Sequence, residues 1–145
     1  MLTLRSAVST LVVFACGFAL GEIYDGGGST ANAQSPKVFE LRTYTTPEGK
    51  LPNLLARFRD HTLEIFERHG MTNVGYWVPQ DAPASSNTLI YILAHDSRDA
   101  ATKSWDAFRN DEEWKRVAAE TQVDGPIVSK VESVFMEATA FSPMK

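Results

Sequence analysis

The order of two hydrophobic periodicities along the chain constrains its fold more than any other feature. Strand side chains alternate between two faces, whereas apolar residues recur every three to four positions on a helix. Helical spacing covers residues 50–69 and a second stretch that begins near Ser97 or Asp99. Four other segments are predicted to be strands: residues 38–45, 72–78, 88–95 and 130–141. The chain therefore runs strand, helix, strand, strand, helix, strand.

This order predicts a ferredoxin-like α+β fold, in which a four-stranded antiparallel sheet carries both helices on one face. Residues at the helix ends agree with it. Gly70 follows the first helix where a left-handed residue is favoured, and Asp111 is expected to interrupt the second helical stretch and cap a further segment.

The second face of such a sheet would be left bare. The strands carry bulky apolar or aromatic residues on both faces, and two helices cover only one of them. Two sheets that pack face to face bury such residues. We therefore expect a homodimer whose paired sheets close an α/β barrel.

The first 33 residues differ in character from the rest. Arg5 precedes an apolar run over residues 7–20, which at about 14 residues suits a secretory signal and is short for a membrane span of roughly 20. Residues 31–33, Ala-Asn-Ala, fit a cleavage site that would leave Gln34 as the mature N-terminus. The alternative is an uncleaved anchor followed by a glycine-rich linker. Either way, we expect the domain at residues 37–143 to be exported, as a periplasmic, secreted or membrane-anchored protein.

Composition excludes several classes of function. The net charge is −4, so the composition does not indicate the basic surface that binds nucleic acid. Cys16 is the only cysteine and falls in the expected signal segment, which removes thiol catalysis and cysteine-based metal sites. The sequence has neither a glycine-rich phosphate loop nor a Gly-x-Ser-x-Gly motif, so phosphate transfer and serine hydrolysis are disfavoured.

The first strand carries a polar face made of Glu40, Arg42 and Tyr44. Such side chains are rarely buried unless they are paired. One interpretation is a structural Glu40–Arg42 ion pair inside the barrel or at its rim. The other is a ligand site in which Arg42 binds a carboxylate, Glu40 orients Arg42 and Tyr44 donates a hydrogen bond. We expect this face to meet the cavity that the dimer forms.

The three histidines have different expected roles. His61 borders the apolar stripe of the first helix and is either a boundary residue or a general acid/base. His95 ends the third strand and is either a hydrogen-bonding residue at the start of the loop or a ligand-binding residue, while His69 fits the helix C-terminus. No metal-ligand spacing is present, so neither a metal site nor a cofactor is predicted. Haem needs only one axial histidine, so haem binding stays open.

Aromatic residues supply the remaining pocket candidates: Tyr76, Trp77 and Tyr91. Strand alternation lets some of them point into the barrel, but a one-residue register slip exchanges the faces, so their faces stay open. Three other aromatic residues have helical spacing and are expected to pack against the sheet: Trp105, Phe108 and Trp114.

Several separated motifs resemble NIPSNAP-family domains, in the same order along the chain. They are Phe-Glu-Leu-Arg-Thr-Tyr at 39–44, Phe-Glu-Arg-His-Gly at 66–70, Gly-Tyr-Trp at 75–77, the run from Trp105 to Trp114, and Ala-Phe-Ser-Pro at 140–143. The resemblance covers about residues 37–143. It implies the dimeric α/β-barrel fold that small cofactor-independent monooxygenases, haem-degrading enzymes and related binding proteins share. The family has no well-established catalytic set, so the resemblance assigns no catalytic residue.

Three functions are compatible with these observations. The leading hypothesis is an exported homodimer that binds a small, partly apolar ligand, without an assigned enzyme activity. The second is a cofactor-independent monooxygenase or a haem-handling enzyme on the same fold, which rests on analogy between folds. The third is an interaction module that an uncleaved N-terminal segment tethers to a membrane.

Overall fold

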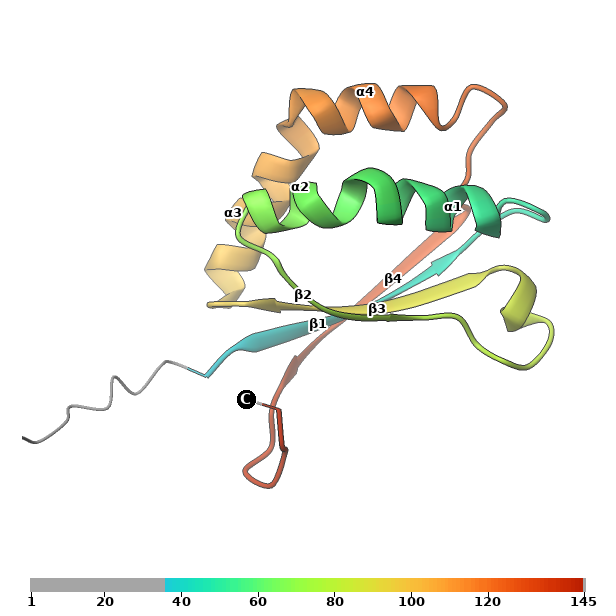
Figure 1. Ribbon diagram of the computed structural model, residues 1–145. Helices are drawn as coiled ribbons and strands as arrows, with labels where there is room; N and C mark the ends of the chain where they lie inside the picture. The colour runs from blue at the N-terminus through green and yellow to red at the C-terminus, as the bar shows by residue number, and fades with distance from the viewer. Residues whose placement is uncertain (1–35, 145) are drawn as a thin grey trace, which may run out of the picture. The chain divides into compact units, whose positions relative to one another are not determined.

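The computed structural model describes residues 36–144, so the expected signal segment at residues 1–33 lies outside the described residues. Four strands form one antiparallel sheet in the order β2–β3–β1–β4, and the helices cover one face of it (Figure 1). The strands are β1 (Val38–Thr45), β2 (Thr72–Trp77), β3 (Thr88–His95) and β4 (Lys130–Glu137). The predicted ferredoxin-like α+β fold is confirmed.

The first helical segment is continuous but not uniform. It consists of α1 (Leu51–Arg57), the π-helical turn η1 (Phe58–Thr62) and α2 (Leu63–Arg68). The Leu63 amide donates to the Phe58 carbonyl five residues back, where an α-helix would bond to the fourth. The segment ends at Arg68, and Gly70 two residues later has a φ of +78°, the left-handed conformation expected after the helix.

The second helical segment divides at Asp111 as predicted. Ser97 caps α3 (Arg98–Asn110), because its hydroxyl accepts a hydrogen bond from the Ala100 amide at 3.0 Å. Asp111 has an extended backbone, and its carboxylate caps α4 (Glu112–Glu120) by accepting from the Trp114 amide at 2.9 Å. A short 3₁₀ turn, η2 (Ala84–Ser86), lies in the loop between β2 and β3.

The strand register determines which side chains face the helices, because residues paired across antiparallel strands share a face. Arg42 pairs with Tyr91 of β3 and Ser133 of β4, and Tyr44 pairs with Leu89 of β3. This face holds the aromatic core, whose buried members include Phe58, Phe66, Tyr91, Trp105 and Phe108.

Strand β2 departs from simple alternation. Asn73 pairs with Leu93, but Gly75 pairs with the next residue of β3, Ile92, so Val74 forms a bulge. The bulge puts Asn73 and Tyr76 on the same face, where the Tyr76 hydroxyl donates to the Asn73 amide oxygen. The strict alternation predicted for residues 72–78, which opposes these two side chains, is therefore wrong.

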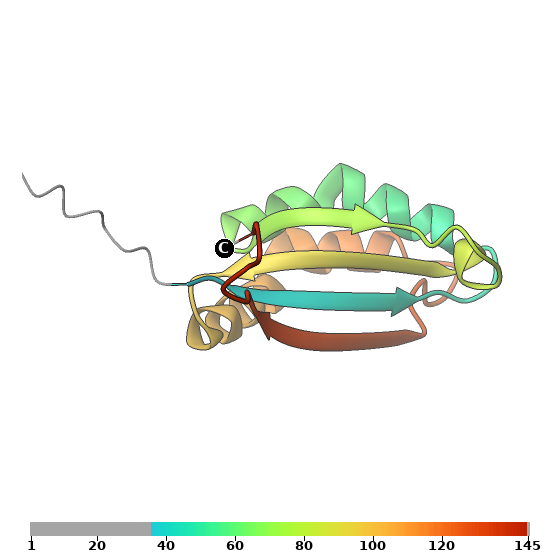
Figure 2. The ribbon, with the colours of Figure 1, turned by 90° about the horizontal axis from the view of Figure 1, so that it is seen from below.

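The opposite face of the sheet is open (Figure 2). Leu41, Ile92 and Val134 share this face by register, and Val134 is 54% exposed. Trp77 also lies here, 50% exposed, with its ring over Gly75, where a Cβ would come within 2.6 Å of that ring. The last strand ends at Glu137 rather than at residue 141, because the chain then turns back across one end of this face. Within residues 36–144, no helix combines the length and apolar character that a membrane span requires.

Candidate ligand-binding site

A buried carboxylate, that of Glu40, is the centre of a polar cluster on the helix-facing side of the sheet. One oxygen, Oε1, accepts from Arg42 at 2.6 Å and from the Ser133 hydroxyl at 2.7 Å. The other, Oε2, accepts from the Trp105 indole at 2.7 Å and lies 3.1 Å from His95 Nε2. These donors come from β1, β4, α3 and β3, so one side chain links four elements.

The hydrogen bonds determine the charge of Glu40. Burial alone would raise the pKa of this carboxyl, but bonds from His95, Ser133, Trp105 and Arg42 outweigh burial and lower the pKa to about 2. Glu40 is therefore an anion at neutral pH with both oxygens occupied. Such a group anchors its neighbours and is unsuited to act as a general base.

Arg42 lies between this carboxylate and an aromatic surface. Its guanidinium carbon is 4.2 Å from the ring centre of Trp105, and Nη2 is 3.4 Å from the Tyr44 hydroxyl. Burial lowers the pKa of Arg42, but Tyr44, Tyr91 and Glu40 outweigh burial and raise it above its usual value. Its Nε is buried and has no hydrogen-bond partner among the described residues.

Two phenols continue the cluster toward the first helix. Tyr44 and Tyr91 have ring centres 5.3 Å apart, and both rings pack against Phe58 of η1. Tyr91 is fully buried, and its hydroxyl lies near Tyr44 but has no partner at hydrogen-bond distance and angle in the part of the chain that the structure describes. Burial raises the pKa of this phenol well above its usual range, so it is a neutral donor.

A second buried arginine, Arg57 at the end of α1, was not among the residues that the sequence suggested. It is 5% exposed, its Nε lacks a partner within residues 36–144, and its guanidinium carbon lies 5.1 Å from the ring centre of Trp114. Burial lowers the pKa of Arg57, and Tyr44 and Tyr91 oppose this shift in part. The next residue, Phe58, packs against both phenols. Its helical spacing from Leu54 is the one signal that could have indicated burial.

A pocket of about 240 Å³ opens beside Arg57, between the first helical segment and the end of α4. His61, half-buried on η1, lines it and is thus brought near Arg57. The remaining lining residues are mainly polar: Asn53, Ala56, Asp60, Glu120, Thr121, Val123 and Asp124. Arg57 is the lining residue that connects this pocket to the buried cluster, because Phe58, which follows it in the chain, packs against Tyr44 and Tyr91.

The other suggested residues divide between the faces. His95 joins the Glu40 cluster, and its Nδ1 is buried with no partner among the described residues. Tyr76 stacks on Tyr91, with ring centres 5.3 Å apart, so it borders the cluster. Trp77 lies on the open face and takes no part in it.

The expectation that the Glu40–Arg42–Tyr44 face meets a cavity formed by the dimer is wrong. Its side chains contact Trp105 of α3 and Phe58 of η1, so this face lies beneath the helices of its own protomer. Strand alternation correctly separates the two faces of β1 but does not indicate which one the helices cover.

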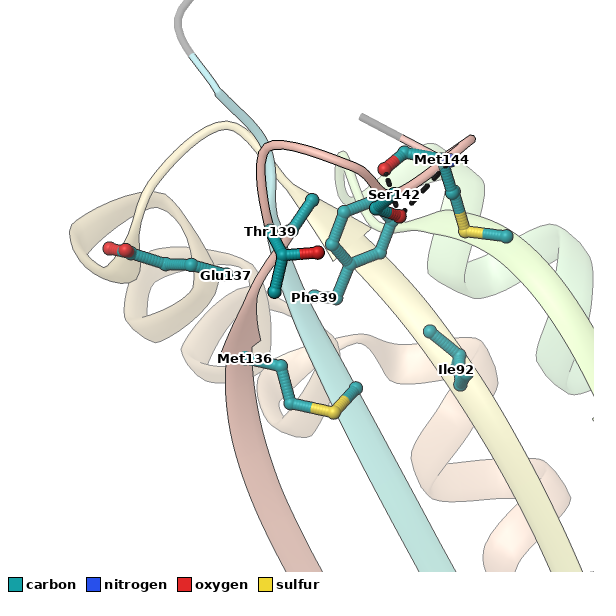
Figure 3. Close-up of a pocket in the computed structure, with 8 residues that line it drawn as sticks. Phe39, Ile92, Met136, Glu137, Thr139, Ser142 and Met144 are labelled. Atoms are coloured by element: carbon teal, nitrogen blue, oxygen red, sulfur yellow. Dashed lines mark hydrogen bonds between the residues drawn. The ribbon is translucent and has the colours of Figure 1, made fainter.

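A second pocket, of about 260 Å³, lies on the open face beneath the C-terminal segment (Figure 3). Phe39, Ile92 and Met136 form its apolar floor, and Ser142 and Met144 lie across it. Its lining is apolar apart from groups at the edge, so it provides surface for packing and few groups for chemistry. Across residues 36–144, no group of three or more His, Cys, Asp or Glu side chains is arranged to hold a metal ion.

Comparison with known proteins identifies relatives of the whole folded part. The family model for NIPSNAP matches residues 39–143. The crystal structure of a NIPSNAP family protein of unknown function from Agrobacterium tumefaciens is 25% identical, with a TM-score of 0.66 over 77% of this chain and 96% of that one. No curated protein matches the sequence.

Two structural neighbours have described activities. SnoaB from Streptomyces nogalater, a cofactor-independent oxygenase, is 15% identical, with a TM-score of 0.51 over 74% of this chain and 98% of that one. The ActVA-Orf6 monooxygenase of Streptomyces coelicolor, in complex with nanaomycin D, is also 15% identical, with a TM-score of 0.53 over 77% and 96%. At these identities the likeness concerns the fold alone.

Proposed function

The chain belongs to the NIPSNAP family, and on that premise we propose that it binds a small, partly apolar ligand between the sheet and the helices of each protomer. The ligand would enter through the pocket beside Arg57 and reach the buried donors behind it. This location differs from a cavity shared by two sheets, because the polar face of β1 is turned toward the helices.

The observation that carries the proposal is a set of buried donors without partners: Arg42 Nε, Arg57 Nε and the Tyr91 hydroxyl, all within residues 36–144. Leaving one such group unpaired costs about 1–3 kcal/mol, so three of them in the layer between the sheet and the helices favour a partner that the described residues do not supply. A ligand with acceptor oxygens would satisfy them. The rings of Phe58 and Tyr44 would contact its apolar part.

Native mass spectrometry of protein purified without added ligand tests this proposal. We expect an additional mass from a co-purified small molecule, with lower occupancy in Tyr91→Phe, because that substitution removes only the unpaired hydroxyl. Tyr76→Phe is the matched control, since its hydroxyl already bonds to Asn73. Arg42→Ala should also lose the ligand.

Wild-type protein with no additional mass, together with a crystal structure that has no residual density near Arg42 and Tyr91, would remove the proposal. Equal occupancy in wild type, Tyr91→Phe and Arg42→Ala would place the ligand elsewhere.

A second candidate function is a cofactor-independent oxygenase, which the fold shared with SnoaB and ActVA-Orf6 favours. In this chain Glu40 is a poor base, so His61 in the pocket would be the group to exchange protons. Oxygen uptake with electron-rich phenols separates the two functions. Consumption that His61→Ala abolishes would support the oxygenase, and no consumption would leave the binding function.

The proposal includes a homodimer outside the cytoplasm. Exposed Trp77 and Val134 on the open face support pairing of two sheets, because a monomer would leave this apolar surface in water. The signal pattern in residues 1–33 supports export. Intact-mass measurement of the exported protein should give a chain that begins at Gln34, whereas the full-length mass would indicate an uncleaved anchor.

A further inference from the structure

Arg57 has an unusual electrostatic position. It is 95% buried, yet no carboxylate lies within ion-pair distance of it among residues 36–144. In that range Arg42, Arg59, Arg68, Arg109 and Arg116 all pair with carboxylates, and Arg98, the other arginine without one, is exposed. A buried charge without a counter-ion is costly, so this position calls for an explanation beyond packing.

The backbone at Arg57 is also irregular. The π turn η1 begins at the next residue, and the Thr62 hydroxyl donates to the Arg57 carbonyl at 3.1 Å. π turns replace standard helical hydrogen bonds and occur frequently at functional sites. The buried cation and the irregular turn are independent observations at one point of the chain.

The pocket beside Arg57 restricts the ligand's charge. Of its carboxylates, Asp60 is paired with Arg59 and Glu120 with Arg116, and both side chains are about half exposed. Asp124 is exposed as well. Carboxylates near the surface and one buried guanidinium favour a ligand with a single negative charge, since a polyanion would be repelled on entry. At about 240 Å³ the pocket lies below the usual range for drug-sized ligands of roughly 300–1,000 Å³, so the ligand is small.

We infer that the ligand is a small monocarboxylic acid and that Arg57 binds its carboxylate. This inference rests on the proposed function and specifies the chemical class of its ligand. A planar guanidinium matches a carboxylate with two parallel hydrogen bonds, and the exclusion of water strengthens both. The bound acid would be the counter-ion that the described part of the chain does not supply.

Calorimetric titration with benzoate and with benzamide tests the inference, because the two differ chiefly in charge. We expect wild-type protein to bind benzoate at least tenfold more tightly than benzamide. Arg57→Met should lose benzoate binding, and Arg57→Lys should retain part of it, because lysine keeps the charge but not the paired donors. Arg109→Met is the matched control, since Arg109 is exposed on α3 and does not line the pocket.

The melting temperature of the ligand-free protein gives a second readout. Arg57→Met should melt at a higher temperature than wild type, because it replaces an uncompensated buried charge with an apolar side chain. A residue that only held the fold together would give the opposite result. Arg57→Lys and the comparison of the two probes on wild-type protein decide the question even if Arg57→Met does not fold.

Equal affinity for benzoate and benzamide, benzoate binding by Arg57→Met at the wild-type level, or binding of neither probe would overturn the inference. The proposed ligand site would survive each of these results. Native mass spectrometry tests that site separately, through the co-purified molecule and its lower occupancy in Tyr91→Phe.

Discussion

At the scale of single residues, Glu40 combines burial, charge and complete hydrogen bonding. Its side chain is 1% exposed, and both oxygens accept two bonds. Removing one partner of a buried charge pair costs more than the pair itself contributes, because the remaining charge is left uncompensated. The carboxylate is therefore expected to be critical for stability, and its low pKa makes it unsuited to act as a general base.

We predict that Glu40→Gln lowers the free energy of unfolding by about 3 kcal/mol, because Arg42 loses its counter-charge in a buried position. Urea denaturation at pH 7 measures the change. Glu48→Gln, in an exposed turn, is the control and should stay within about 0.5 kcal/mol of wild type. A cost below 1 kcal/mol for Glu40→Gln would contradict the assigned role.

The same residue predicts a pH dependence. Folding lowers the pKa of Glu40 from 4.5 to about 2, so its contribution to stability is complete above pH 4.5 and is lost as pH falls toward 2. Urea titrations between pH 7 and pH 3 should give a steep decline for wild type and a shallower one for Glu40→Gln. Parallel declines would show that Glu40 has an ordinary pKa in the folded protein.

The sequence indicates part of this cluster and misses the rest. Two-residue spacing on one strand predicts the contact between Glu40 and Arg42, which the structure has at 2.6 Å. Ser133 comes from a strand more than 90 residues away, and only the register of β1 with β4 brings it to Glu40. Arg57 was missed because a helical arginine normally extends into water, and only tertiary packing encloses this one.

At the scale of elements, Asp111 connects the two helical segments. It caps α4, and its Oδ2 lies 2.7 Å from His69 Nε2 at the end of α2 and 3.2 Å from Arg68. The Trp114 amide and His69 lower the pKa of this carboxyl to about 2. We expected His69 to interact with the C-terminus of its own helix. Its partner in the structure is instead Asp111, the N-cap of α4.

We predict that Asp111→Ala destabilises the protein by about 1–2 kcal/mol and reduces the helical circular-dichroism signal, because α4 loses its N-cap. Asp111→Asn should cost less, since asparagine also caps helices well. Asp106→Ala, an exposed residue of α3, serves as the control. An Asp111→Asn variant as unstable as Asp111→Ala would mean that the bonds to His69 and Arg68 matter more than the cap.

The sequence predicts element boundaries correctly where the hydrophobic periodicity is regular. The prediction fails where an extra residue is inserted into a strand or a helical turn. Strands β1 and β3 have the predicted bounds. The π turn was not predictable, because Phe58, Thr62 and Ile65 keep a spacing of three to four residues whether or not one hydrogen bond shifts. The bulge at Val74 was missed for a similar reason, since it depends on pairing with β3.

At the scale of the whole molecule, the order of elements predicts the fold because few topologies accommodate it. The same order predicts one covered and one open face. Which face of β1 is covered depends on how the helices cross the sheet, and this information is not local to the strand. Only the structure could therefore establish that the polar face of β1 lies beneath the helices.

We predict that Val134→Asp weakens self-association at least 30-fold, or about 2 kcal/mol, because it puts a charge among the exposed apolar residues of the open face, on the edge strand β4. Sedimentation equilibrium measures the dissociation constant. Val123→Asp, in the exposed segment after α4, introduces the same charge away from this face and should leave association unchanged. If both variants remain dimers of equal affinity, the open face is not the interface.

The shared bonding of Glu40 has a consequence for how the sequence can diverge. Replacing Glu40 alone would leave the guanidinium of Arg42 without its carboxylate partner and the indole N–H of Trp105 without its acceptor. Replacing Arg42 or Trp105 alone would leave the buried carboxylate with one hydrogen bond fewer. Any single substitution of Glu40, Arg42 or Trp105 is therefore expected to destabilise the protein. Across homologous sequences we expect positions 40, 42, 95, 105 and 133 to change together or not at all, as one inherited unit.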